Sequence, residues 1–388
     1  MSAHHAALNY LLQTAVEQGV APGIVAGIAN SGGTTYEGAA GVRAAGAEQS
    51  MTTDAVFRIF SMTKAIASIA ALQLYERGLL DLDAPVENYA PAFGQLQVIE
   101  GFDGDTPRLR APKRKATVKH LMTHTAGLAY QFWNADTKKY VEVTGNPGFL
   151  SGKKLGIMYP LTFDPGDKWH YGINIDWLGQ VIEGITGKTL REVCREQIFV
   201  PLAMPDSDFE CEGAARDRLV GNHARGEDGS MSIISLDPPS HPEVYGGGYG
   251  AYSTLGDYLR FLRAMLNKGE LDGVHILKPE TLAYALQNHT GDLEMTKLTT
   301  VIPQVSSDAE FFPGRAKSHG LAFMSNREAI PGTLSANSHF WAGALNTYFW
   351  FDPARDVAGV LLMQFLPFAD RRALGILVDF QKSVYAGG

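Results

Sequence analysis

A serine and a lysine three residues apart are the first residues whose types and spacing could do chemistry. Ser61 is followed by Met62, Thr63 and Lys64, and the next nine residues carry no charge. On a helix, three positions bring a side chain onto the same face, one turn on. A buried lysine has a lowered pKa, so Lys64 could accept the serine proton or hold a nearby base in its anionic form. Free N–H groups at a helix N-terminus also stabilise an oxyanion, so the pattern is typical of a nucleophilic serine.

The same spacing recurs at Ser151 and Lys154, which serve as an internal comparison. This second copy lies in a polar stretch rich in Gly and Pro, residues 145–154, where nothing would remove water from the lysine. The first copy begins an apolar helix instead. The local pattern leaves a plainer alternative open, in which Ser61 only caps that helix and Lys64 extends to the surface.

The elements around this pair are predicted from hydrophobic periodicity and turn residues. Residues 62–75 form an Ala-rich helical pattern, and Gly78 closes it. Two strands joined by a turn at residues 30–33 are expected near the N-terminus, and two buried strands near the C-terminus. The expected strands cover residues 23–29, 34–40, 346–351 and 357–365, and a last helix covers residues 370–385.

Strands and a helix at both ends of the chain, with helices between, predict an α/β (α+β) organisation. Residues 1–60 and 245–388 would form one discontinuous domain with a central antiparallel sheet flanked by helices. Residues 61–244 would form an inserted domain that is mainly or entirely helical. Within it, residues 118–199 read as mostly helical, whereas the polar residues 210–242 read as irregular.

Five segments together carry a resemblance to a known family. They include Ser-Met-Thr-Lys and Trp-Ala-Gly motifs, and they cover residues 57–64, 76–85, 118–127, 163–179 and 340–353. In this order and spacing, the chain resembles the serine β-lactamase-like superfamily, which includes class C β-lactamases and D-Ala-D-Ala carboxypeptidases. Its closest likeness is to family VIII carboxylesterases and the related statin-side-chain acyltransferases. The resemblance implies a β-lactamase/transpeptidase-like fold with the active site between the two domains.

The resemblance also implies roles for residues at matching positions. Ser61 would be the acylated nucleophile and Lys64 its partner. Tyr171 would be a general base and later a general acid, and its phenol would need a strongly lowered pKa that Lys64 could supply. The backbone N–H groups of Ser61 and Ala344 would form the oxyanion hole. Without the family, Tyr171 reads as one of fifteen tyrosines, packing at a helix start.

Two departures from the lactamase pattern bear on the substrate. Ile173 fills the position of an asparagine, and Asn174, one residue later, reads as a separate polar residue of a helix face. Trp341-Ala-Gly343 replaces the Lys-Thr-Gly of lactamases, so a cation is exchanged for an aromatic wall. Family VIII esterases share the Trp-x-Gly change. Both departures favour neutral, apolar acyl groups over β-lactams, although Trp341 could also be plain strand packing.

Further substrate-binding candidates are four aromatic residues in loops: Tyr130, Phe132, Trp133 and Tyr249. The alternative for each is ordinary aromatic packing in the core or on the surface.

His120 and His124 have the i, i+4 spacing of a zinc-binding pair, but residue 121 is Leu where the metalloprotease motif needs Glu. Structural histidines and no metal are therefore expected.

These residues predict a serine carboxylesterase that acts on short-chain or small neutral esters through an acyl-Ser61 intermediate. Weak β-lactamase activity is compatible with it, and no cofactor is expected. Two alternative enzymes stay open: an acyltransferase that uses the same acyl-enzyme, and a β-lactamase or D-Ala-D-Ala peptidase. A non-enzymatic scaffold is disfavoured because Ser61, Lys64 and Tyr171 are all present.

The resemblance implies a small-molecule ester as the partner, and composition disfavours two other classes of partner. The 388 residues hold 33 basic and 41 acidic side chains, and a net charge of −8 disfavours nucleic-acid binding. No run of 18 apolar residues is present, so no membrane span is expected. The N-terminus lacks the pattern of a signal peptide, which predicts a cytoplasmic location. Two cysteines exclude a disulfide-rich scaffold, and nothing in the sequence predicts the oligomeric state.

Overall fold

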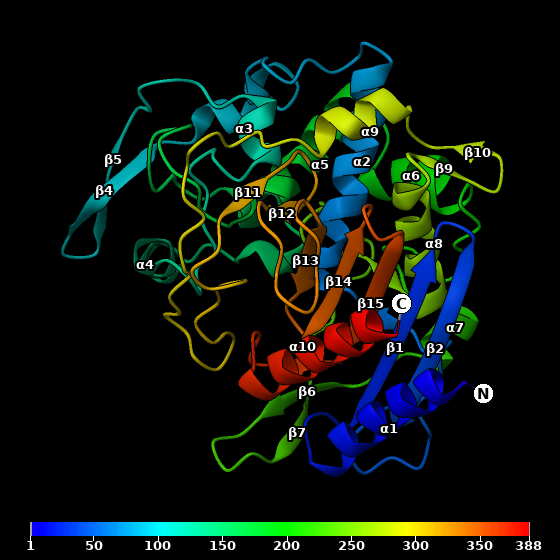
Figure 1. Ribbon diagram of the computed structural model, residues 1–388. Coiled ribbons are helices and arrows are strands. Elements are labelled where there is room, and N and C mark those ends of the chain that lie inside the picture. The colour runs from blue at the N-terminus through cyan, green and yellow to red at the C-terminus, as the bar shows by residue number, and fades with distance from the viewer. Residues whose placement is uncertain (1, 388) are drawn as a thin grey trace.

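The computed structural model describes residues 2–387 and contains a seven-stranded antiparallel sheet (Figure 1). Both ends of the chain contribute to it, and strand β1 near the N-terminus pairs with β15 near the C-terminus. In spatial order the strands are β11 (Lys317–His319), β12 (Met324–Asn326), β13 (His339–Gly343), β14 (Thr347–Asp352), β15 (Val357–Leu362), β1 (Gly23–Asn30) and β2 (Gly33–Gly41). The predicted antiparallel sheet and its four strands are therefore confirmed.

Helices cover both faces of this sheet. Gly27 of β1 faces Leu255 and Leu259 of α8 (Leu255–Leu266). On the other face, Trp350 of β14 packs against Phe380 of α10 (Arg371–Ala386). The first helix, α1 (Ala3–Glu17), contacts α10 and β2 on that face, and Figure 1 shows the two helices lying across the front of the sheet. The last helix was predicted from the sequence, and α10 confirms it.

A second group of helices surrounds α2 (Thr63–Glu76), the helix that carries Lys64. Its residues 63–74 are all buried, because apolar and small side chains cover every face of it. It packs against α5 (Asn174–Thr186) and α6 (Leu190–Cys194), and α5 packs against α3 (Val118–Met122). The remaining α-helices of residues 2–387 are α4 (Ala135–Thr144), α7 (Gly213–Asp217) and α9 (Pro279–Ala285).

Two expectations for residues 61–244 were wrong. This region is not entirely helical, because β4 (Val98–Asp103) and β5 (Thr106–Arg110) form a hairpin. Residues 210–242 are not merely irregular, because β6 (Asn222–Arg225) pairs with β7 (Met231–Ile234). Strands β5 and β7 hold no buried residue, so neither shows the alternation that marks a half-buried strand.

Short strands join distant parts of the chain. β6 also pairs in parallel with β16 (Phe365–Leu366), and β3 (Phe57–Arg58) pairs with β8 (Tyr252–Ser253). A last small hairpin consists of β9 (Glu270–Leu271) and β10 (Val274–His275). The division into two domains at residues 60 and 245 stays a prediction.

Among residues 2–387, no helix is both long enough and apolar enough to cross a membrane. The expected cytoplasmic location stays a prediction.

Candidate active site

Ser61 lies in a short 3-10 helix, η1 (Phe60–Met62), that leads directly into α2. The preceding residue, Phe60, has a φ of 43°, a left-handed conformation that is costly for a non-glycine residue. The adjoining β3 is held by pairing with β8. Ser61 is half-buried and lines a cavity, so the chain presents its hydroxyl to a space that a small molecule could enter.

Lys64 is buried beside this serine. Its Nζ donates hydrogen bonds to Ser61 Oγ at 3.1 Å, to Tyr130 Oη at 2.9 Å and to Gly248 O at 2.7 Å. All three protons of the ammonium therefore have acceptors. A neutral amine in the same place would accept a proton from an adjacent hydroxyl, and Ser61 provides one.

The second Ser-x-x-Lys copy has none of these features. Lys64 is buried and hydrogen-bonded to Ser61. In the second copy, Ser151 donates to Gly148 O at 2.6 Å, and the Lys154 side chain is exposed. The surface alternative for Lys64 was wrong, because the helix that carries it is buried on every side.

A buried carboxylate, Asp176, accompanies the lysine. Burial lowers the pKa of Lys64 to about 7, and the negative charge of Asp176 opposes that shift. Burial raises the pKa of Asp176 to about 6, against the effect of the Lys64 charge. Sequence reasoning missed Asp176. The available signal was an acidic residue between Ile175 and Trp177, in an otherwise apolar helix start.

Tyr171 reaches Ser61 from the segment before α5. Its hydroxyl hydrogen-bonds with the Ser61 side chain and accepts one from Trp341 Nε1 at 3.2 Å, and the Lys64 Nζ lies 4.7 Å from its ring centroid. Burial raises the pKa of this phenol above its usual value and outweighs both hydrogen bonds, which act to lower it. The strongly lowered pKa expected from the sequence was wrong, because the aromatic side chains around Tyr171 remove it from water.

Three histidines near the site are structural in this geometry. His124 lies behind Tyr171, with ring centroids 4.8 Å apart, and its Nδ1 is 3.1 Å from the side-chain nitrogen of Asn174. Burial lowers the pKa of His124 well below its usual value and that of His319 to about 4. His120 accepts a hydrogen bond from Thr117 N and caps α3. The imidazole next to Tyr171, that of His124, and the His319 imidazole beside it are therefore neutral.

Strand β13 brings the Trp341-Ala-Gly343 motif against η1 and the residue before it. A Cβ on Gly343 would lie 2.3 Å from Ile59 O and 2.3 Å from Thr347 Oγ1, so only glycine allows this close approach. Ala344 follows directly and lines the cavity together with Ser61. The packing at Gly343 thereby brings residue 344 to the cavity that Ser61 lines.

The cavity is mostly apolar and aromatic. Six of the seven substrate-binding candidates line it: Tyr130, Phe132, Trp133, Tyr249, Trp341 and Gly343. Ile173 does not, because it lies at the buried start of α5 with its side chain wholly inside the core. The two charged side chains of the lining, Glu310 and Lys317, form an ion pair with each other at 3.5 Å. The lining thus offers an uncharged surface to a ligand.

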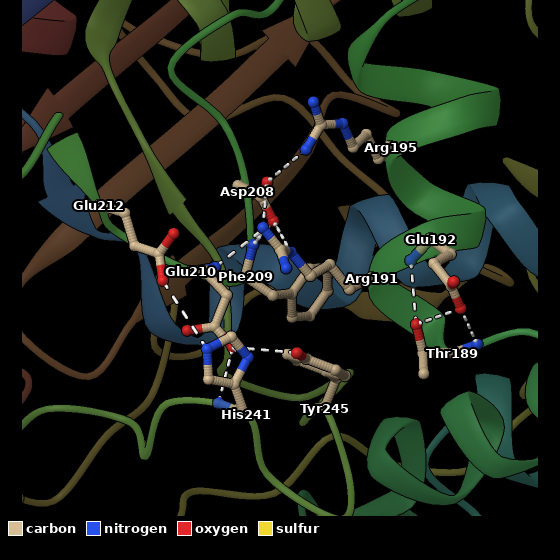
Figure 2. Close-up of polar contacts among 10 residues, drawn as sticks. All are labelled: Thr189, Arg191, Glu192, Arg195, Asp208, Phe209, Glu210, Glu212, His241 and Tyr245. Atoms are coloured by element: carbon tan, nitrogen blue, oxygen red, sulfur yellow. Dashed lines mark hydrogen bonds and ion pairs between the residues drawn. The ribbon is translucent and has the colours of Figure 1, made fainter. Parts of the chain in front are cut away.

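A polar network fastens the segment that supplies Gly248. Figure 2 shows Asp208 held by Arg191, with bonds of 2.6 and 3.1 Å, and by Arg195 at 3.5 Å. Further along, Glu210 accepts hydrogen bonds from Tyr245 Oη at 2.9 Å and His241 N at 2.8 Å. Arg191 belongs to α6, so residues 208–245 are tied to that helix just before the turn at residues 246–248.

Comparisons with known proteins agree with this arrangement. A model of the Beta-lactamase family matches residues 8–381. The chain belongs to the beta-lactamase family. Among its relatives, Lovastatin esterase of Penicillium rubens is 31% identical over 376 residues, which is 92% of each protein. Monacolin J acid methylbutanoyltransferase of Aspergillus terreus is 29% identical over 351 residues, 87% of this chain and 83% of that protein.

A solved structure in the same family matches the whole chain. It is Simvastatin Synthase (LovD) from Aspergillus terreus, as the LovD6 mutant, and it superposes with a TM-score of 0.85 at 27% identity. The match covers 100% of this chain and 95% of that one. These comparisons confirm the resemblance and the β-lactamase/transpeptidase-like fold expected from the sequence, and they group this member of the beta-lactamase family with both an esterase and acyltransferases.

Proposed function

We propose that this protein is a serine carboxylesterase that hydrolyses small neutral esters through an acyl-Ser61 intermediate. The strongest support is the meeting of Ser61, Lys64 and Tyr171 at the wall of a mostly apolar cavity. These groups come from two distant segments, and ordinary packing gives no reason for a lysine to be buried between them.

Acylation begins when neutral Lys64 accepts the proton of Ser61 and Oγ attacks the ester carbonyl. With its pKa lowered to about 7, the amine is neutral in much of the protein near neutral pH. The tetrahedral intermediate collapses, the bond to the alcohol oxygen breaks, and Tyr171 gives its proton to that oxygen. The acyl-enzyme then contains an ammonium on Lys64 and a phenolate on Tyr171, and these opposite charges stabilise each other.

Deacylation restores both groups. The Tyr171 phenolate accepts a proton from water, and the resulting hydroxide attacks the acyl carbon. When the bond to Ser61 breaks, the Lys64 ammonium returns a proton to Oγ across the 3.1 Å contact. The acid leaves, and every proton is accounted for over the cycle.

The oxyanion is assigned to the backbone N–H groups of Ser61 and Ala344. The close approach of β13 to the segment before Ser61 supports this role, because Ala344 directly follows the contact at Gly343 and lines the same cavity as Ser61. Rigid donors placed before the reaction stabilise developing negative charge at no cost of reorganisation.

The substrate class follows from the lining. Trp341 and its aromatic neighbours favour an apolar acyl or alcohol group, and the pairing of Lys317 with Glu310 leaves that cation already neutralised. Neutral esters fit this surface better than the anionic β-lactams, for which a weak side activity is expected. Hydrolysis of a chromogenic cephalosporin faster than of p-nitrophenyl butyrate would instead favour the β-lactamase alternative.

Acyl transfer is the second candidate, because Monacolin J acid methylbutanoyltransferase and Simvastatin Synthase resemble the chain over most of its length. An alcohol would then replace water as the nucleophile in the second half of the cycle. Product analysis with a competing alcohol, and with a thioester as acyl donor, separates the two reactions. If transfer outruns hydrolysis at all alcohol concentrations tested, hydrolysis is the side reaction.

The test of the esterase proposal is hydrolysis of p-nitrophenyl acetate and butyrate by the wild type and by Ser61→Ala. We expect the Ser61→Ala rate to fall by about 10³-fold or more, as for other enzymes that lose a nucleophile. The matched control is Ser151→Ala, from the exposed copy of the motif, which should keep the wild-type rate. Full activity in Ser61→Ala would rule out Ser61 as the nucleophile.

A further inference from the structure

Asp176 is a buried carboxylate that the mechanism so far leaves unused. It lies in the first turn of α5, it is fully buried, and its Oδ1 accepts a hydrogen bond from Gly248 N at 3.0 Å. Among the described residues, Oδ2 has no hydrogen-bond partner. A half-satisfied carboxylate in the interior is costly, so something must compensate for its charge.

The backbone of Gly248 connects this carboxylate to Lys64. Its N–H donates to Asp176, and its C=O accepts from Lys64 Nζ at 2.7 Å. A Cβ on Gly248 would lie 2.5 Å from Asp176 Oδ2, so the contact requires glycine at this position. The two peptide groups that flank the Gly248 Cα thus bind an anion on one side and a cation on the other.

The other titratable groups around Lys64 and Asp176 are neutral near pH 7. Burial raises the pKa of the phenols of Tyr130, Tyr159, Tyr171 and Tyr249. The imidazoles on the opposite side, those of His124 and His319, have pKa values lowered by burial.

We propose that Asp176 is a positioning residue for Lys64: through the backbone N–H and C=O of Gly248 it fixes the amine beside Ser61, and its charge stabilises the ammonium that forms when Ser61 gives up its proton. The inference rests on the proposed function, because it gives Lys64 the role of proton acceptor.

This arrangement explains why residues 247 and 248 of the run Gly246–Gly248 are glycines. At Gly247 a Cβ would lie 2.5 Å from Ile175 O, so the turn also packs against the residue before Asp176. Side chains in the turn would push it away from α5 and break the contact between Gly248 and the carboxylate. The run Gly246–Gly248 therefore lets a loop backbone enter between two buried charges.

The test is the pH dependence of kcat/KM for p-nitrophenyl butyrate in Asp176→Asn. In the wild type, kcat/KM should rise with pH through about 7 as Lys64 loses its proton. Asparagine can still accept from Gly248 N but has no charge, so the lysine loses the effect that raised its pKa. We expect the acid limb of the pH profile, the part where kcat/KM rises with pH, to move to lower pH by about one unit in Asp176→Asn. The plateau value of kcat/KM should fall by about tenfold or more.

The matched control is Asp257→Asn. Asp257 is also a buried carboxyl whose pKa burial raises to about 6, but its partners are Ser207 and the backbone of Asp206. The acid limb of the pH profile of Asp257→Asn should coincide with that of the wild type. A merely structural role for Asp176 would lower the plateau and leave the limb in place, and that result would overturn the proposal.

Gly248→Ala gives a second variant in case Asp176→Asn does not fold. It keeps the carboxylate but forces it away from the peptide, so the acid limb should again move to lower pH. Gly256→Ala is its control, because a Cβ there meets nothing within 4 Å. An unchanged limb and plateau in Gly248→Ala would contradict the inference.

A phosphonate ester that labels the nucleophile distinguishes this inference from the function on which it rests. Failure to label Ser61 in the wild type would sink the proposed function. Labelling of Ser61 in the wild type and in Asp176→Asn, with coincident acid limbs, would sink only the role of Asp176.

Discussion

At the residue scale, burial shifts the pKa values of two neighbouring groups, Lys64 and Tyr171, in opposite directions. Burial of Lys64 lowers its pKa to about 7, and burial of Tyr171 raises the pKa of its phenol. Each group is therefore neutral when the substrate arrives, and the amine is the better proton acceptor. In the proposed mechanism, this pair of shifted pKa values favours Lys64 for the first proton transfer and Tyr171 for protonation of the leaving group.

Tyr171→Phe tests that assignment. Phenylalanine keeps the ring beside Lys64 but cannot protonate the alcohol or activate water, so kcat/KM for p-nitrophenyl acetate should fall by about 10²-fold to 10⁴-fold. Tyr385→Phe is the control, since its hydroxyl bonds to Asp352 in another part of the molecule. A Tyr171→Phe enzyme with the wild-type rate would remove the tyrosine from the mechanism.

The sequence predicted part of this site and not the rest. Ser61 and Lys64 were recognisable from their spacing and apolar surroundings, and Tyr171 only from the family resemblance. The pKa of Tyr171 and the partnership of Asp176 with Gly248 were not predictable, because burial is produced by side chains from distant segments. The Trp341 ring that covers Tyr171 lies 170 positions further along the chain.

At the element scale, the approach of β13 to η1 sets the width of the site. Gly343 is the point of closest contact, where a Cβ would meet the backbone oxygen of Ile59 and the hydroxyl of Thr347. The Ile59 oxygen belongs to the backbone, so it cannot move without moving the segment that leads to Ser61. The proposed oxyanion donors would thus be positioned by the packing of two backbones.

Gly343→Ala should widen this contact and displace Ala344 from the cavity. We expect kcat to fall by about 10²-fold, in the range seen when one oxyanion donor is lost, and the thermal midpoint to fall as well. Gly375→Ala is the comparison, because Gly375 is an exposed position inside α10 where a Cβ meets nothing within 4 Å. That change should leave kcat unchanged and stabilise the protein by about 0.5–1 kcal/mol.

Hydrophobic patterns predicted the helices and strands whose side chains form the core, and they missed the strands whose side chains are not buried. Strands β1, β14 and β15 and helix α2 are mostly apolar, and β2 alternates between buried and exposed residues. The structure has these elements within a few residues of the expected bounds. The β6–β7 hairpin was missed because Ile233 is exposed and the strand around it buries nothing. Its pairing with β16 depends on a contact between residues 223 and 365, which no local pattern could reveal.

At the scale of the whole molecule, one sheet joins both ends of the chain and encloses titratable groups. His339 on β13 and His319 on β11 are buried, and burial lowers their pKa values to about 3 and about 4. Ser325 Oγ lies 2.7 Å from His339 Nδ1. The folded protein therefore holds these imidazoles neutral at pH values where the unfolded chain would protonate them.

The free energy of unfolding should fall as the pH drops below about 6.5. There the unfolded chain binds more protons than the folded one, and the loss continues until the pH reaches the folded-state pKa of each histidine. Asp176, Glu183 and Asp257 act in the opposite direction, because burial raises their pKa values and each takes up a proton in the folded state over a pH range where the unfolded chain does not. The histidines whose pKa burial lowers outnumber these three groups. Urea unfolding at pH 7.5 and pH 5 measures the difference.

His339→Asn should make this pH dependence shallower, because it removes one buried imidazole. His275→Gln is the control, since His275 is exposed on the β9–β10 hairpin. Equal slopes in the wild type and His339→Asn would show that His339 takes no part in the acid sensitivity.

The most direct test of the account is peptide mapping after reaction with a p-nitrophenyl phosphonate ester, which traps the serine as a stable tetrahedral adduct. The account predicts one adduct, on the peptide that contains Ser61, with esterase activity lost in proportion to labelling. Ser61→Ala should remain unlabelled, and Ser151 should be unmodified in both proteins. An adduct on another residue, or full esterase activity in protein labelled at Ser61, would contradict the claim that catalysis proceeds through Ser61.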